Sequence, residues 1–244
     1  MSISPAGAAA AAGWVAITAL KPPRQAKTRM AAPEGVRAGL AVAMALDTLA
    51  ALGASSRVRQ TLLVCPDPLV RERITGYAAL GHVTVLRGEP AGDLNSALRY
   101  AIGVARRRAP GAGIAVVPAD LPALSAAEVD LALLLAPGGR PGVVPDLEEE
   151  GTVMLTVPAG ASVRPRFGRR SYAAHRRSGA QPFGDERLPG LRRDMDTVAD
   201  LMGARHLLGP HTTAFLRGRR WPAPAGTPSS SQTSPQTSPQ TSPR

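Results

Sequence analysis

The sequence has little cysteine, few aromatic residues and hardly any lysine. Its one cysteine, Cys65, excludes an intrachain disulfide framework and a zinc site built from several cysteines. Aromatic residues make up 3% of the chain while hydrophobic residues make up 44%, so the core must be mainly alanine, valine and leucine. Such a composition is typical of a parallel sheet covered by alanine-rich helices.

The sequence also indicates no membrane-spanning segment and no targeting segment. The apolar stretches are broken by charge or fall short of the roughly 18–20 residues that cross a bilayer. The start, MSISPAGAAAAAG, lacks the basic and apolar regions of a signal peptide, and the end repeats QTSP and is too polar to fold. We therefore expect a cytoplasmic protein with no membrane partner. It would have a flexible extension over 1–13, a single domain over 14–219 and a disordered tail over 220–244.

Acidic residues are outnumbered, which leaves a formal net charge of +11. This charge favours nucleic acid, an anionic membrane or phosphorylated small molecules as partners. Nine arginines and only two acids lie between Arg164 and Arg193, yet this stretch has few aromatics for base stacking and no known nucleic-acid module. We interpret it as solvated surface with a few anion contacts, and expect no nucleic acid as partner.

Only two of the 29 basic residues are lysines, and both lie in the segment KPPRQAKTRM that follows the apolar run WVAITAL. Lysine acts as a compact point charge on phosphate, whereas arginine is a planar fork. Lys21, Lys27 and Arg29 therefore make a plausible cradle for a polyphosphate. A solvated basic loop explains the segment equally well.

Hydrophobic patterns alternate along the chain between short strands and longer helices, which predicts an α/β fold with a mostly parallel, twisted sheet. Ligands of such sheets bind outside the carboxyl ends of the strands, where the Lys21 loop and the residues after Val117 would both lie. The predicted strands are 14–20, 58–65, 82–86, 114–118, 142–145 and 152–157, and the predicted helices are 34–52, 68–80, 93–108, 125–136, 170–179 and 197–208.

Three aspartates are candidate ligands for Mg²⁺, which prefers hard oxygen donors. Asp120 follows the predicted strand 114–118, and Asp194 and Asp196 are two residues apart, so both can face one side of an extended segment. Asp120 can instead be a turn residue held by its own backbone, and the segment Asp196-Thr197 can instead begin a helix. The four histidines show no metal-ligand spacing.

No G-x-S-x-G nucleophile motif and no P-loop are present. The chemistry that remains is phosphoryl or nucleotidyl transfer, which depends on positioning and charge neutralisation.

Five segments together resemble one enzyme family: KPPRQAKTRM, LNSAL (94–98), VPADLPAL (117–124), RFGRRSYAAHRRSGA (166–180) and LRRDMDTVADL (191–201). They are similar to the CofC/FbiD family of guanylyltransferases, from about Val15 to Gly209. The resemblance implies a nucleotide-diphospho-sugar-transferase-like (GT-A, Rossmann-like) fold. It also implies GTP and a phosphorylated three-carbon acid as substrates, pyrophosphate as a product and a role in coenzyme F(420) biosynthesis.

The resemblance also implies roles for individual residues. Lys21, Lys27 and Arg29 would hold the GTP phosphates, with Asp67 and Asn95 near the guanine and ribose. Asp120 with Asp196 or Asp194 would hold Mg²⁺, and the acid substrate would contact Thr152, Gly168 and Ser171.

Several points stay open at this stage. The acceptor can be phosphoenolpyruvate or 2-phospho-L-lactate, and a homodimer is neither indicated nor excluded. Alternatives are a nucleotidyltransferase for a sugar phosphate or a molybdopterin, and a basic nucleic-acid-binding protein. The sequence departs from the family at DLEEEGTVML, where a D-G-T-G-T-type stretch is usual. Because Glu148–Glu150 would repel an anionic substrate from inside the pocket, we expect them on an exposed hairpin turn.

Overall fold

The computed structural model describes residues 13–20, 30, 32–77, 81–87, 93–217 and 219. Lys21, Lys27 and Arg29 lie outside these residues, as do the tail at 220–244 and all of the expected extension except Gly13. The expected limits of the domain therefore stay predictions.

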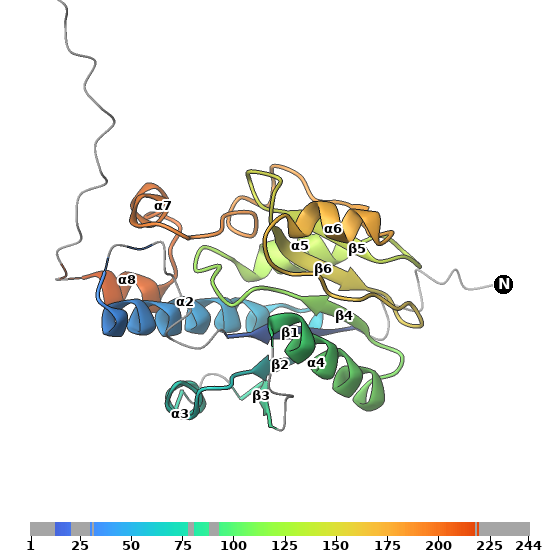
Figure 1. Ribbon diagram of the computed structural model, residues 1–244, viewed down its shortest axis with the longest axis horizontal. Coiled ribbons are helices and arrows are strands. Elements are labelled where there is room, and N and C mark those ends of the chain that lie inside the picture. Colours follow the sequence, from blue (N-terminus) through green and yellow to red (C-terminus); the bar gives the residue numbers. More distant parts are fainter. Residues whose placement is uncertain are drawn as a thin grey trace, which may run out of the picture.

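A seven-stranded sheet has the strand order β3-β2-β1-β4-β6-β5-β7 (Figure 1). Strands β1 to β4 are parallel, β6 is antiparallel to both β4 and β5, and β7 is parallel to β5. The predicted α/β fold with a mostly parallel sheet is confirmed. The strands are Trp14–Ala19 (β1), Val58–Val64 (β2), Val83–Leu86 (β3), Gly113–Val116 (β4), Gly142–Pro145 (β5), Thr152–Val157 (β6) and the unpredicted Gln181–Pro182 (β7).

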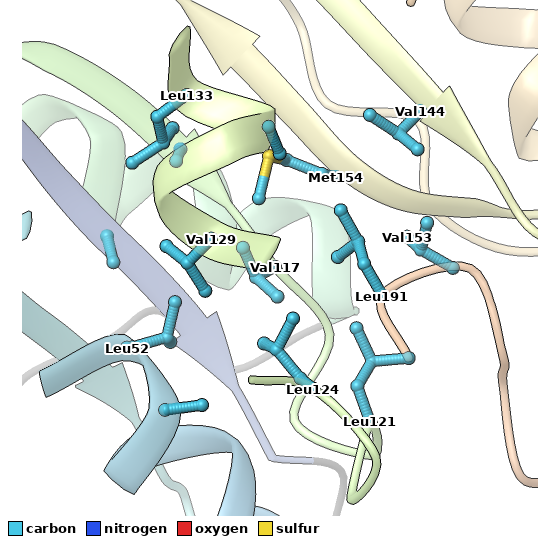
Figure 2. Packing of buried hydrophobic residues seen from close by; sticks show 14 of the residues in the cluster. Leu52, Val117, Leu121, Leu124, Val129, Leu133, Val144, Val153, Met154 and Leu191 are labelled. Carbon is cyan, nitrogen blue, oxygen red and sulfur yellow. The ribbon is translucent and has the colours of Figure 1, made fainter. Parts of the chain in front are cut away.

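Helices cover both faces of the sheet because neighbouring strand residues point to opposite sides. Ala16 of β1 belongs to the hydrophobic cluster of α2 and α5, while Ile17 belongs to the cluster of α4. Figure 2 shows Leu52 of α2 and Val129 of α5 in the first of these clusters. The helices are Glu34–Ala54 (α2), Pro68–Thr75 (α3), Leu94–Arg108 (α4), Ala126–Leu135 (α5), Ser171–Arg177 (α6), Val198–Gly203 (α7) and Pro210–Leu216 (α8).

Helix α2 departs from the expectation that no apolar stretch is long enough to cross a membrane. It has 21 residues and a mean hydropathy of 1.5, which meets that requirement by length and composition. However, 61% of its apolar window is buried inside the protein, where α2 packs against β2, α5 and α8. Burial of this kind is typical of a core helix in a folded domain.

Several predicted helix ends are wrong because a glycine or proline has another role. Gly53 does not end α2; a Cβ at this position would overlap the ring of His82, so the glycine allows close packing. Helix α3 ends at Thr75 with Gly76 as its C-cap. The last predicted helix, 197–208, ends at Gly203, and Pro210 begins the unpredicted α8. A proline at the first helical position is favourable because its missing N–H has no partner there.

Candidate active site

A cavity of about 380 Å³ lies at the carboxyl ends of β1 and β4. The start of β6 and the end of β5 reach the same edge, because β6 is antiparallel to both β4 and β5. Six of the predicted site residues line this cavity, namely Asp120, Thr152, Gly168, Ser171, Asp194 and Asp196.

The three aspartates form a cluster in this cavity. One carboxylate oxygen from each of Asp120, Asp194 and Asp196 lies within 4.8 Å of the other two, and all three residues are half-buried. Like charges held this close repel one another unless a cation is bound between them. A set of three carboxylate oxygens fits a hard divalent cation such as Mg²⁺.

Met195 explains why Asp194 and Asp196 face the same side. Its side chain is fully buried in a cluster with Leu40 and Met44 of α2. Because side chains alternate along an extended segment, the two aspartates that flank Met195 share the other side of the segment, and both line the cavity. The expected helix start at Asp196-Thr197 is confirmed as well: Thr197 is the N-cap of α7 and forms a capping box with Asp200, while Asp196 lines the cavity.

Thr48 holds the backbone beside Asp120. Its hydroxyl accepts a hydrogen bond from the N–H of Leu121 at 3.1 Å and lies 3.0 Å from the carbonyl oxygen of Met44. Thr48 is completely buried in α2. The loop that carries Asp120 is therefore attached to a core helix.

Glu128 holds the segment that leads to the other two aspartates. Its buried carboxylate accepts hydrogen bonds from the N–H groups of Gly190 (2.6 Å) and Leu191 (3.3 Å). It also accepts from the backbone and hydroxyl of Ser125, which completes the predicted capping box of α5. Gly190 has no room for a side chain, because a Cβ there would overlap the carbonyl oxygen of Ala123. The sequence predicted the capping box and missed this second role of Glu128.

One part of the cavity wall contains Thr152, Gly168 and Ser171. Gly168 has a φ of 131°, a conformation that favours glycine. The loop holding it is fixed by Asn95, whose side chain bonds both the N–H (2.7 Å) and the carbonyl oxygen (2.9 Å) of Phe167. Helix α6 begins at Ser171 with Arg170 as its N-cap, so Ser171 is not itself the capping residue.

A buried histidine supports this wall. His175 has no exposed surface; its Nδ1 lies 2.9 Å from Oγ1 of Thr152, and its Nε2 accepts the N–H of Arg166 at 2.9 Å. Burial and the positive charge of Arg166 lower the pKa of His175 to about 4. The ring is therefore neutral at physiological pH.

This depressed pKa predicts a pH-dependent stability. The unfolded chain binds a proton at His175 near pH 6.5 and the folded chain only near pH 4, so stability is full above pH 6.5 and falls as the pH drops toward 4. Between pH 7 and pH 5 this group should remove roughly 2 kcal/mol of unfolding free energy. Urea unfolding at both values tests this, with His175→Gln as the control. An equal pH dependence in the parent and the variant would contradict it.

The three glutamates of DLEEEGTVML, the segment that departs from the family pattern, lie on a turn between β5 and β6. Glu148, Glu149 and Glu150 are exposed, which confirms that expectation. Asp146 closes the turn by accepting the N–H groups of Glu150 (2.9 Å) and Gly151 (2.7 Å). Glu150 nevertheless lines the cavity, together with Arg169 and Arg170 of the loop that precedes α6. Two positively charged residues, Arg169 and Arg170, therefore line the same cavity as the negatively charged Glu150.

Two other predicted residues do not line the cavity, although both have clear partners. Asp67 is the N-cap of α3 and accepts the N–H groups of Leu69 (2.9 Å) and Val70 (3.0 Å). The amide of Asn95 holds Phe167, as described above. The sequence analysis overlooked the local signal for the cap, an aspartate followed by proline at the first helical position. The contact of Asn95 had no local signal, because Phe167 lies 72 residues away.

The fold is shared with two solved structures. A protein from Desulfovibrio desulfuricans G20, assigned as a nucleotide-diphospho-sugar transferase, matches with a TM-score of 0.59 and 18% identity over 84% of this chain and 94% of its own. A 4-diphosphocytidyl-2C-methyl-D-erythritol synthase matches with a TM-score of 0.52 and 13% identity over 80% of this chain and 97% of its own. At such identities the likeness establishes the fold alone.

Closer relatives are found among curated proteins, although no protein-family model matches the chain. The phosphoenolpyruvate guanylyltransferase of Streptomyces avermitilis is 40% identical over 216 residues, which cover 87% of this chain and 98% of that protein. The enzyme of the same name from Salinispora arenicola is 42% identical over 206 residues, 82% of this chain and 91% of that protein. These matches confirm the family indicated by the sequence motifs: the chain belongs to the phosphoenolpyruvate guanylyltransferases.

Proposed function

We propose that this protein transfers GMP from GTP to phosphoenolpyruvate and releases pyrophosphate, as a step in the biosynthesis of coenzyme F(420). The observation that carries the proposal is that one cavity is lined by the aspartate cluster of Asp120, Asp194 and Asp196 and also by Thr152 and Ser171. A groove for a nucleic-acid backbone would have no use for three converging carboxylates. We also propose that the reaction takes place in the cytoplasm.

The aspartates are the proposed metal ligands. Mg²⁺ held by Asp120, Asp194 and Asp196 would supply positive charge to the phosphates of both substrates. The acceptor's phosphate oxygen attacks the α-phosphorus of GTP, a new P–O bond forms, and the bond to pyrophosphate breaks. Because a phosphate oxygen is already ionised at neutral pH, the chain needs no general base and contributes mainly positioning.

The part of the cavity wall formed by Thr152, Gly168 and Ser171 is the proposed acceptor site, called the acceptor wall. The Thr152 and Ser171 hydroxyls can donate hydrogen bonds to the acid, and Gly168 lets the backbone come close to it. Arg169 and Arg170 line the same cavity and add positive charge near an anionic ligand.

The nucleotide site is proposed from the family resemblance. Lys21, Lys27 and Arg29 would bind the GTP phosphates; the segment that carries them follows Leu20, which lines the cavity. Asp67 and Asn95 are the proposed neighbours of the guanosine, in addition to the capping and loop-fixing contacts that they make within the protein.

Initial rates of pyrophosphate release test the choice of substrates. The full chain is assayed with Mg²⁺ and GTP in the presence of phosphoenolpyruvate, of 2-phospho-L-lactate or of no acceptor. The assay is then repeated with CTP in place of GTP. We expect the highest kcat/KM for the pair of GTP and phosphoenolpyruvate. A higher value for 2-phospho-L-lactate or for CTP would contradict the corresponding part of the proposal.

A further inference from the structure

His175 contacts both elements that form the proposed acceptor wall, namely Thr152 at the start of β6 and the loop around Gly168. We propose that His175 is a positioning residue: it fixes the direction of the Thr152 hydroxyl, so that this hydroxyl donates its hydrogen into the cavity. The inference rests on the proposed transfer to phosphoenolpyruvate. It adds a residue that acts through Thr152 and does not itself line the cavity.

The hydrogen-bond partners determine which nitrogen of the ring carries the proton. The backbone N–H of Arg166 points to Nε2 at 2.9 Å, and a backbone N–H can only donate. Nε2 must therefore be unprotonated, and a neutral ring then carries its hydrogen on Nδ1. Nδ1 in turn donates to Oγ1 of Thr152 at 2.9 Å.

This arrangement leaves the hydroxyl hydrogen of Thr152 for another acceptor. A hydroxyl has one hydrogen and two lone pairs, and here a lone pair is used by His175. Since Thr152 lines the cavity, its hydrogen is available to an oxygen of a bound ligand. A carboxylate or phosphate oxygen suits this position, whereas a ligand group that can only donate does not.

The surroundings keep the ring neutral and fixed. Burial and the charge of Arg166 lower the pKa of His175. A hydrogen bond with the backbone of Ser171 acts in the other direction and raises this pKa, but the net effect keeps the ring unprotonated. The ring also packs against the edge of Phe167, with 5.1 Å between the ring centroids. Because Asn95 holds Phe167 on its other side, the loop leading to Gly168 is fixed between two buried or half-buried side chains.

The first test requires no catalytic activity. The full chain is labelled with nitrogen-15, and the ring signals of His175 are identified by their loss in His175→Gln. At neutral pH we expect an unprotonated Nε2 and a protonated Nδ1. A ring protonated on Nε2 would overturn the proposal, even if the chain proves to be active with GTP and phosphoenolpyruvate.

The second test uses kinetics to examine the Thr152 hydroxyl without any change at His175. Thr152→Val should raise KM for phosphoenolpyruvate about tenfold or more, because the donor to the anion is lost, and leave KM for GTP within about twofold. The variant also removes the acceptor of the Nδ1 hydrogen of His175, so its stability is measured alongside. Thr152→Ser keeps the hydroxyl and should remain near the parent. An unchanged KM for phosphoenolpyruvate in Thr152→Val would overturn the proposal. These two variants serve even if substitutions at His175 prevent folding.

A double-mutant cycle then tests whether His175 acts through Thr152. Glutamine can still accept the N–H of Arg166 but does not reproduce the donor at Nδ1, so His175→Gln should also raise KM for phosphoenolpyruvate. Combined with Thr152→Val, it should raise that KM no further than Thr152→Val alone. Effects that multiply would show that His175 acts independently and would overturn the proposal. If the parent shows no activity with phosphoenolpyruvate, the proposed function fails, and the nitrogen-15 spectrum still decides the role of His175.

Discussion

Asp120→Asn is expected to lower the rate of pyrophosphate release from GTP and phosphoenolpyruvate by roughly a hundredfold or more. The amide has nearly the shape of the carboxylate but lacks its charge, and Asp120 lies in a cluster of three carboxylates within 4.8 Å of one another. The fold should persist, because the amide fills the same space as the carboxylate. Steady-state kinetics over a range of Mg²⁺ concentrations measures the effect.

Asp185→Asn is the matched control for charge. Asp185 does not line the cavity; it is half-buried and pairs at the protein surface with the exposed Arg187 at 2.6 Å. Exposed pairs contribute little, so this variant should keep activity within about twofold of the parent. If Asp120→Asn retained activity within about threefold, Asp120 would have no part in binding the metal.

Glu128→Ala is expected to lower the free energy of unfolding by about 2–4 kcal/mol and to reduce the activity of the protein that remains folded. The substitution leaves the N–H groups of Gly190 and Leu191 without their acceptor in a buried place. Those residues precede the segment of Asp194 and Asp196, so the metal cluster should lose its fixed geometry. Urea unfolding and Mg²⁺ dependence of the rate measure the two effects.

Two further variants make the test at Glu128 specific. Glu128→Gln keeps one carbonyl oxygen as an acceptor and should lie between the parent and Glu128→Ala. Glu72→Ala, at an exposed position of α3, should change stability by no more than about 0.5 kcal/mol. Full stability together with unchanged Mg²⁺ dependence in Glu128→Ala would show that this carboxylate does not support the site.

Local patterns in the sequence predicted the features that depend on neighbouring residues. Short apolar runs placed strands β1 to β6, and the spacing of Asp194 and Asp196 on an extended segment predicted that both can face one side. The capping box of Ser125 and Glu128 also forms as predicted. These predictions succeed because each rests on side-chain direction or on capping over a few residues.

Contacts between distant residues could not be predicted in this way. Asp47 accepts the N–H groups of His211 and Thr212, more than 160 residues away, and so holds the start of α8 against α2. The sequence alone presents Gly209-Pro210 as a stop signal, whereas this distant carboxylate makes it a helix start. In the same way, His175 reads as an ordinary helical residue until the fold brings Thr152 to its ring.

The identity of the product tests the central claim most directly. The full chain is incubated with Mg²⁺, GTP and phosphoenolpyruvate, and the products are followed by phosphorus NMR and mass spectrometry. We expect one guanylylated phosphoenolpyruvate, joined through a diphosphate, for each pyrophosphate released, and no turnover without the acceptor. Release of pyrophosphate with free GMP as the other product, or at a rate independent of phosphoenolpyruvate, would contradict the proposed function.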